Sequence, residues 1–331
     1  MPFFDVAFGA NFTRRSLLVG LAAVAAMPAL GKPVEALQTL LAPTGASVTL
    51  ARAFDSGDLS PCAPGATLKP WRDNDELRAA IVSGQARLFS SPTHVPANLA
   101  NRGLPIRLLG LLGAGHLYVV SSEEKVDSLN DLAGKPVLGF FHNDMPDLVF
   151  RAAARMEGLD ADKDFQLSYV QGGMEAAQML AAGRVATAIL SEPAATMAIS
   201  MAASQGRTLR RAVSLQDVWS QHKGSQGIPM VGVAVHQSLI DEAPELIEAL
   251  RKALPAAKDW ALAHPTDAGV LAEKMLGMKA PIFAKALPTM NLDYRTGVAA
   301  RMDLEAFYTT LIANAPDALA GKLPGPEFYL S

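Results

Sequence analysis

Residues 136–193 read PVLGFFHNDMPDLVFRAAARMEGLDADKDFQLSYVQGGMEAAQMLAAGRVATAILSEP, and this stretch decides the fold class. Three short apolar runs, typical of buried strands, alternate with two stretches of helical periodicity. Strands and helices that alternate at this spacing form a mainly parallel sheet covered by helices. We therefore predict an α/β fold, with strands at 136–141, 165–170 and 185–190 and helices at 146–157 and 174–182.

The sequence on either side continues the same alternation. Asp73 to Glu76 places a capping residue and acidic side chains at the start of a helix that ends at Gly84. The segment 55–70 is rich in proline and glycine, so we expect a loop that ends in a short strand. The last part of the chain is expected to be mostly helical, with breaks at Pro255, Pro265, Pro281 and Pro288. Further strands are expected at 37–42, 67–71, 87–90, 106–112, 116–121 and 229–236, and a long helix at 243–254.

The composition excludes several classes of protein. The chain has 331 residues, of which 50% are hydrophobic and 18% charged, with a formal net charge of −3. Disorder requires low hydrophobicity and high net charge, so this chain folds, and its length suits about two domains. The near-neutral charge gives no basic footprint, so we expect no nucleic-acid partner. The single cysteine, Cys62, excludes an internal disulfide bond and a cysteine-based metal site.

The N-terminus has the pattern of an export signal. Arg14 and Arg15 precede an uncharged apolar run at 17–30, and a small-x-small cleavage site follows at 29–31. The paired arginines indicate the Tat route, while Sec export remains open. A membrane anchor is the alternative, but the run is shorter than the roughly 20 residues that span a bilayer. We therefore expect residues 1–31 to be removed and the mature protein to be soluble and periplasmic.

Known catalytic and cofactor motifs are missing from the sequence. It contains no complete dinucleotide fingerprint, no phosphate-binding loop and no Gly-x-Ser-x-Gly nucleophile motif. Its six histidines form no His-x-x-x-His pair, and its acidic residues are expected to lie on solvated surfaces. We therefore predict no catalytic residue, no resident metal and no cofactor.

Polar residues gather where four predicted strands end, and ligands of open α/β sheets bind at that edge. Three of these loops lead into predicted helices, whose N-termini carry free N–H groups and a partial positive charge suited to an oxyanion. Given the weak net charge, an anion would be held by such dipoles and by hydroxyls. Alternatively, Ser91, Thr93 and Asn143 only cap their helices. The four loops are 43–47, 90–94, 141–144 and 171–174.

Several larger side chains have two possible roles each. His116 and His142 could hydrogen-bond a ligand or be structural imidazoles. Trp71 could stack on a planar ligand or belong to the core. Met145 and Met174 could form a soft wall or fill gaps in the core. The candidate ligand-binding residues are Thr44, Gly45, Ser90, Ser91, Thr93, His116, His142, Asn143, Gly172, Gly173 and Glu192.

Three segments, in order and at their spacing, resemble the periplasmic binding proteins of ABC importers in the nitrate/sulfonate/taurine group, which includes the THI5-like binders of thiamine-pyrimidine precursors. The first is NDELRAAIVSGQ at 74–85, followed by Leu88 and Phe89. The second is SLNDLAGKPV at 128–137, which is similar to the family's stretch that opens the second lobe. The third is AAQMLAAGRV at 176–185 with Ser191-Glu192-Pro193.

The resemblance implies a type II periplasmic-binding-protein fold, with two lobes that each hold a mainly parallel sheet flanked by helices. The first lobe would comprise 32–121 and 227–331, and the second 122–226. A small-molecule ligand would lie between lobes that close by a hinge motion. The closed form, expected to be a monomer, would dock on an ABC permease in the inner membrane. The unusual segment 55–70 could reshape the ligand site.

We therefore expect an exported solute receptor for a small polar ligand, either anionic or heterocyclic. One alternative is an exported enzyme on the same fold, which the Tat-like signal favours mildly. The other is a metal-binding periplasmic protein that uses His94, His116, His142 and methionines.

Overall fold

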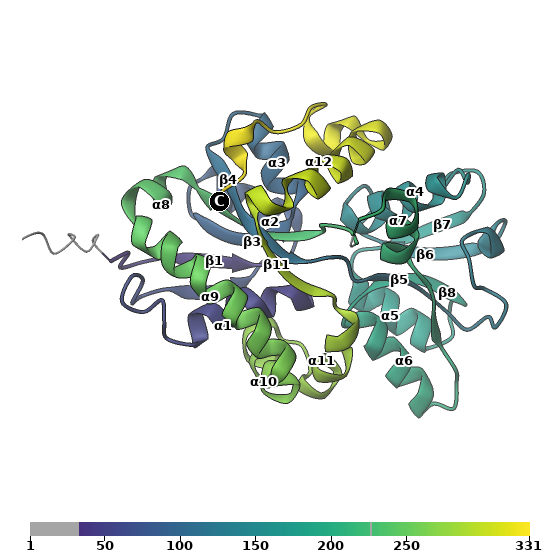
Figure 1. Cartoon of the computed structure of the whole chain (residues 1–331). Helices are drawn as coiled ribbons and strands as arrows, with labels where there is room; N and C mark the ends of the chain where they lie inside the picture. The colour runs from purple at the N-terminus through teal and green to yellow at the C-terminus, as the bar shows by residue number, and fades with distance from the viewer. Residues whose placement is uncertain (1–32, 226) are drawn as a thin grey trace, which may run out of the picture.

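The computed structural model describes residues 33–225 and 227–331 and shows two β-sheets side by side, each flanked by helices (Figure 1). We call the elements around the six-stranded sheet the first lobe and those around the five-stranded sheet the second lobe. The predicted export signal, at 1–31, lies outside the described residues.

The first lobe is assembled from both ends of the described chain. Its sheet has the order β11-β4-β10-β3-β1-β2, in which β1 is parallel to β2 and β3 while β10 runs antiparallel to β3 and β4. Strand β11 is antiparallel to β4. The strands are β1 (Gln38–Leu41), β2 (Thr67–Pro70), β3 (Leu88–Pro92), β4 (Ile106–Gly113), β10 (Val231–His236) and β11 (Leu292–Thr296). The helices are α1 (Val48–Asp55), α2 (Asn74–Val82), α3 (His94–Asn101), α8 (Gln237–Glu242), α9 (Pro244–Ala263), α10 (Pro265–Leu276), α11 (Ala280–Ala286) and α12 (Gly297–Asn314).

The second lobe contains the stretch that decided the fold class. Its sheet has the order β7-β6-β8-β5-β9, with β6 parallel to β7 and β8, and β5 antiparallel to β8 and β9. The strands are β5 (Leu117–Ser121), β6 (Pro136–Phe140), β7 (Gln166–Val170), β8 (Thr187–Ser191) and β9 (Arg210–Ser214). The helices are α4 (Met145–Met156), α5 (Gly173–Ala181), α6 (Ala194–Ser204) and α7 (Leu215–Lys223). The predicted α/β class, with a sheet flanked by helices in each lobe, is confirmed. Both sheets are mixed rather than mainly parallel, because β5, β10 and β11 pair antiparallel with their neighbours.

The structure corrects three details of the prediction. Strand β5 hydrogen-bonds to β8 and β9 and so belongs to the second lobe. The lobe boundary expected after residue 121 therefore falls before this strand. The sequence did not show this because apolar strands on both sides of the crossing look alike. Strand β11 was expected to be helical, but its half-buried LDYRT segment pairs with β4 at the sheet edge. Pro255 lies inside α9 rather than ending it, beside the fully buried Leu254.

The chain crosses between the lobes at Ala114–His116 and returns through a segment that includes residues 227–230, and the two crossovers touch. The backbone N–H of Ile228 donates to the carbonyl of Ala114 at 3.0 Å. Gly227 next to it has φ +115°, and a Cβ there would lie 2.1 Å from the Ala114 oxygen. Only glycine fits this position, so we infer that it keeps the two crossovers in contact.

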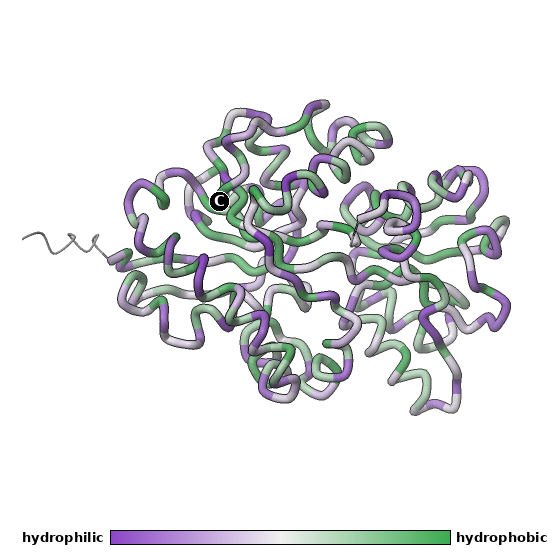
Figure 2. The backbone as a smooth tube through the Cα atoms, viewed as in Figure 1, coloured by the Kyte–Doolittle hydropathy of each residue, from purple (hydrophilic) through white to green (hydrophobic). Residues whose placement is uncertain are grey.

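A hydrophobic core continues from one lobe into the other. Trp219 of α7 meets Phe307 of α12 edge to face, with ring centroids 5.4 Å apart, and both are buried. Figure 2 shows hydrophobic residues along the inner strands and hydrophilic residues at many outer loops. Within the two described ranges, no helix combines the length and apolar character needed to cross a membrane.

Candidate functional site

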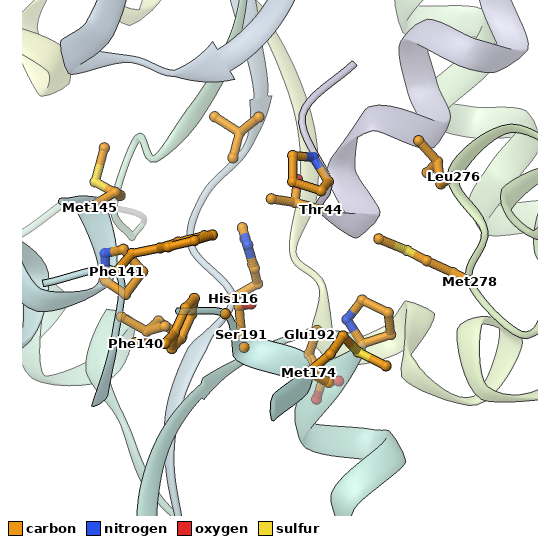
Figure 3. Close-up of a pocket in the computed structure, with 18 of the residues that line it drawn as sticks. Thr44, His116, Phe140, Phe141, Met145, Met174, Ser191, Glu192, Leu276 and Met278 are labelled. Atoms are coloured by element: carbon orange, nitrogen blue, oxygen red, sulfur yellow. The ribbon is translucent and has the colours of Figure 1, made fainter. Parts of the chain in front are cut away.

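A cavity of about 440 Å³ lies between the lobes, where strand-end loops of both sheets meet (Figure 3). The first lobe contributes residues that follow β1, precede α2 and connect α10 to α11. The second lobe contributes residues at the ends of β6, β7 and β8. All four loops singled out in the sequence supply at least one lining residue, because the carboxyl ends of parallel strands share one edge of a sheet.

The walls of this cavity are mainly aromatic and thioether side chains. Figure 3 shows Phe140 and Phe141 on one side, with Leu276 and Met278 opposite. Aromatic faces and polarisable sulfurs favour a flat, unsaturated ligand over a small hydrated ion. The other large apolar lining residues are Trp71, Met145, Met174, Met197, Met230 and Ile282.

Phe141 lines the cavity from a loop with an unusual backbone. Its φ is +51° and that of Asn143 is +62°, the left-handed region that is costly for most residues but better tolerated by asparagine. The fully buried carboxylate of Asp147 accepts from the Asn143 N–H at 2.9 Å and from the Tyr169 hydroxyl at 2.7 Å. These bonds hold the loop in the strained conformation.

Figure 3 labels three uncharged polar residues on the cavity wall, Thr44, His116 and Ser191, of which the first two were predicted. Burial lowers the pKa of His116 to about 4, so its imidazole is neutral at pH 7 and offers one donor and one acceptor. Within the described ranges, neither the His116 ring nor the Thr44 hydroxyl has a hydrogen-bond partner, and the hydroxyl oxygen is buried. The His116 ring and the Thr44 hydroxyl are therefore free to hydrogen-bond a ligand.

Asp144 places a protein carboxylate at the N-terminus of α4. It accepts the N–H of Met145 at 2.6 Å and the side-chain amide of Asn74. Nε2 of His94 lies 3.5 Å from the same carboxylate, but burial lowers the pKa of this histidine, which disfavours its charged form. The helix N-terminus expected to attract a ligand anion therefore already holds an anion.

Glu192 also lines the cavity, but its carboxylate is satisfied by other protein groups. Arg211 donates to Oε1 through Nε at 2.7 Å and through a second nitrogen, and Thr289 of the first lobe donates at 3.0 Å. The N–H of Thr196 reaches the other oxygen at 3.1 Å. Figure 3 shows this carboxylate turned away from His116. Glu192 is thus a buried, paired charge.

The N-terminus of α5 lies on the cavity wall and has no side-chain cap. Its N-cap is Gly172, which has no side chain to bond the first N–H groups. Gly172 and Gly173 both line the cavity, as predicted. Their backbone can therefore approach and donate to a polar group of a ligand.

Three of the predicted hydroxyl residues bond within the protein instead of lining the cavity. Ser90 Oγ accepts the Ala42 N–H at 2.8 Å, Thr93 Oγ1 donates to the Pro229 carbonyl at 2.7 Å, and Ser91 donates to the carbonyl of Pro92. The backbone carbonyl of Ser90 still supports the cavity wall, because it accepts a hydrogen bond from Nε1 of the lining residue Trp71 at 3.1 Å. Neither Ser91 nor Thr93 caps a helix through its side chain.

Gly45, His142 and Asn143 are also outside this cavity's lining. A Cβ at Gly45 would lie 2.5 Å from the sulfur of Met290, so this glycine serves close packing. His142 is exposed and stacks on Tyr169, with ring centroids 4.4 Å apart. The predicted residues that do line the cavity are Thr44, His116, Gly172, Gly173 and Glu192.

Sequence reasoning missed other lining residues. Phe141 and Asp144 lie in a loop that was identified from the sequence, but His142 and Asn143 were predicted as its ligand-binding residues instead. Asn74 was read only as part of a helix start, and Leu276 and Met278 lie in a region read only as helical. Among the residues described by the structure, no group of three or more His, Cys, Asp or Glu side chains could hold a metal ion.

The buried neutral His116 predicts a pH-dependent stability. Its folded-state pKa, about 4, lies below the ordinary histidine value of 6.5, so in this pH range the unfolded chain binds a proton more readily than the folded chain. Between pH 6.5 and 5 the free energy of unfolding should fall by about 1.5 kcal/mol from this group. When urea unfolding is measured at both pH values, the fall in the free energy of unfolding should be smaller in His116→Gln than in the native protein by that amount. Equal losses in the two proteins would contradict this assignment.

The comparisons with known proteins agree with the two-lobed architecture. The family model described as NMT1/THI5 like matches residues 67–268. No curated protein matches the chain.

Solved structures of binding proteins share the fold. An ABC transporter structure from Parabacteroides distasonis has 21% identity and a TM-score of 0.73, covering 89% of this chain and 99% of that one. The alkanesulfonate-binding protein SsuA from Xanthomonas axonopodis pv. citri, bound to MOPS, has 15% identity and a TM-score of 0.66, covering 89% and 98%. The periplasmic nitrate-binding protein NrtA from Synechocystis PCC 6803 has 14% identity and a TM-score of 0.61, covering 77% and 70%.

Proposed function

The chain belongs to the NMT1/THI5-like family, and from that premise we propose that it is the exported, periplasmic solute-binding protein of an ABC importer. The support is the interlobe cavity and the structural neighbours, which are binding proteins of ABC transporters. The lobes would close on the ligand by a hinge at the two crossovers. The protein would deliver it as a monomer to a permease in the inner membrane.

The ligand we propose is a planar nitrogen heterocycle that is uncharged or carries a positive charge. The observation that carries this choice is Asp144, whose carboxylate lines the cavity and occupies the N-terminus of α4. A nitrate or sulfonate would meet this negative charge inside apolar walls. Arg211, which lies nearby, is already paired with Glu192. The cationic lining residues Arg72 and Lys279 are exposed.

The polar groups around the cavity suit such a heterocycle. The ring nitrogens of His116 and the hydroxyl of Thr44 can each exchange a hydrogen bond with a ring nitrogen, amino group or carbonyl. The Asp144 carboxylate can accept from an N–H. Trp71, Phe140 and Phe141 supply aromatic surface for the ring itself. We propose these side chains, with the backbone of Gly172 and Gly173, as the ligand-binding residues.

A thermal-shift panel tests the ligand class. Cytosine, adenine and nicotinamide represent the heterocycles, while nitrate and methanesulfonate represent the anions. A ligand at 100 times its Kd stabilises a protein by about 2.7 kcal/mol, so at least one heterocycle should raise Tm by several degrees. The anions should leave Tm unchanged. Stabilisation by the anions alone would overturn the proposed ligand class.

Thr44→Val is a matched variant for the same panel. The Thr44 hydroxyl oxygen has no partner in the described protein, so its replacement by a methyl group should leave the Tm of the free protein within about a degree of the native value. The shift caused by the heterocycle should shrink, because a ligand polar group loses its partner. An undiminished shift would remove Thr44 from the site.

A further inference from the structure

Asp144 is a point at which the two lobes meet across the cavity. Its carboxylate belongs to the second lobe, at the start of α4. The amide nitrogen of Asn74, in α2 of the first lobe, donates to Oδ2. Nε2 of His94, in α3 of the first lobe, lies 3.5 Å from Oδ1. Helices remote in sequence are therefore tied together by one side chain.

This contact differs from the polar contacts beside the crossovers. Asn291 donates to the carbonyl of Gly115 at 2.7 Å, within a crossover segment itself. Thr289, two residues earlier, donates to Glu192. Contacts at a hinge can persist while the lobes rotate. The contact at Asp144 joins helices α2 and α3 to α4, so it depends on how the lobes are oriented.

The Asp144 carboxylate is also held in place by contacts within its own lobe, the second. The Met145 N–H holds Oδ1, and Asp147 fixes the preceding loop through Asn143. On the opposite side, Oδ1 of Asn74 and Nδ1 of His94 are buried and have no partner in the described structure. A buried unsatisfied atom costs free energy, so closing the lobes has an opposing cost that water relieves when they open.

We propose that Asp144, bonded to Asn74 and facing His94, is the reversible clasp that keeps the two lobes closed over the cavity. The charge-assisted bond from Asn74 favours the closed form, while the unsatisfied atoms beside it keep that preference small. Asp144 is thus a positioning residue for closure as well as part of the cavity wall. The inference rests on the proposed function for its purpose, but it can be tested without any ligand.

The test measures closure through a second interlobe contact. Nζ of Lys285 in α11 donates to Oγ of Ser200 in α6 at 3.3 Å, so we expect these positions to separate when the lobes open. Lys285→Cys and Ser200→Cys, combined with Cys62→Ser, would be cross-linked by a short bismaleimide in the ligand-free protein. The cross-linking rate then reports the closed population.

Adding Asn74→Ala should slow this cross-linking about three- to six-fold, because losing a hydrogen bond to a charged group lowers the closed-to-open ratio about tenfold. The matched control is Asp75→Ala, on the same helix, whose side chain is fully exposed; it should leave the rate unchanged. Asp144→Asn retains an oxygen to cap α4 and should also slow the reaction, with folding verified by circular dichroism.

Equal rates in Asn74→Ala and Asp75→Ala would overturn the clasp. Because no ligand is present, that result would leave the ligand panel untouched. Failure of every heterocycle to stabilise the protein, with a slowed cross-linking rate, would instead reject the ligand class and keep the clasp.

Discussion

Trp219→Ala is expected to lower the free energy of unfolding by about 4 kcal/mol, in the range observed when a fully buried tryptophan is truncated. Trp219 is 2% exposed, packs edge to face on Phe307 and donates Nε1 to Ser225 at 2.9 Å. Because α7 belongs to the second lobe and α12 to the first, the substitution opens a cavity in the core that joins the lobes.

Equilibrium unfolding in urea measures this effect. The matched control is Trp260→Ala in α9, a partly buried tryptophan whose ring carries the Arg52 guanidinium 4.1 Å above it. This control should cost less, about 1–2 kcal/mol, since the Trp260 ring is only partly buried and packs on the outside of the core. If both substitutions cost the same, the Trp219 contact does not hold the lobes together.

Glu192→Ala is the second large effect, with an expected loss of about 3 kcal/mol. The Glu192 carboxylate is fully buried, and its removal leaves the guanidinium of Arg211 without its main partner. Breaking a buried pair typically costs 3–5 kcal/mol, and the partial exposure of Arg211 places this pair at the lower end. Thr289 would also lose the acceptor that ties it to the second lobe.

A second substitution tests whether Glu192 and Arg211 stabilise the protein as a coupled pair. In the double variant Glu192→Ala with Arg211→Leu no charge is left unpaired, so stability should return part of the way towards that of the native protein. Glu248→Ala, which breaks an exposed pair with Arg251, should cost less than 1 kcal/mol. A double variant as unstable as the sum of its singles would show that the two side chains are not coupled.

The sequence predicted the place of the site better than its chemistry. Thr44, Gly172 and Gly173 were expected at strand ends, and the rule that parallel strands end at one edge brought them to one cavity. Whether a hydroxyl at a strand end faces a ligand depends on residues far along the chain. Ser90 bonds the backbone of Ala42, a partner that no local pattern reveals.

The charge of the ligand site could not be predicted from local sequence patterns either. The near-neutral composition suggested that helix dipoles would hold an anionic ligand. In the structure Asp144 takes that position at α4, and its partner Asn74 lies 70 residues away. Aspartate before a helix is an ordinary capping pattern, so the sequence could indicate the cap but not the contact with the other lobe. Strand β5 was misplaced for a related reason, since a buried apolar run does not specify its sheet.

Native mass spectrometry of the protein, purified without unfolding, tests the central claim most directly. We expect a bound small molecule whose mass and fragments identify an uncharged or cationic nitrogen heterocycle, with reduced occupancy in Thr44→Val. A bound sulfonate, nitrate or metal ion would contradict it.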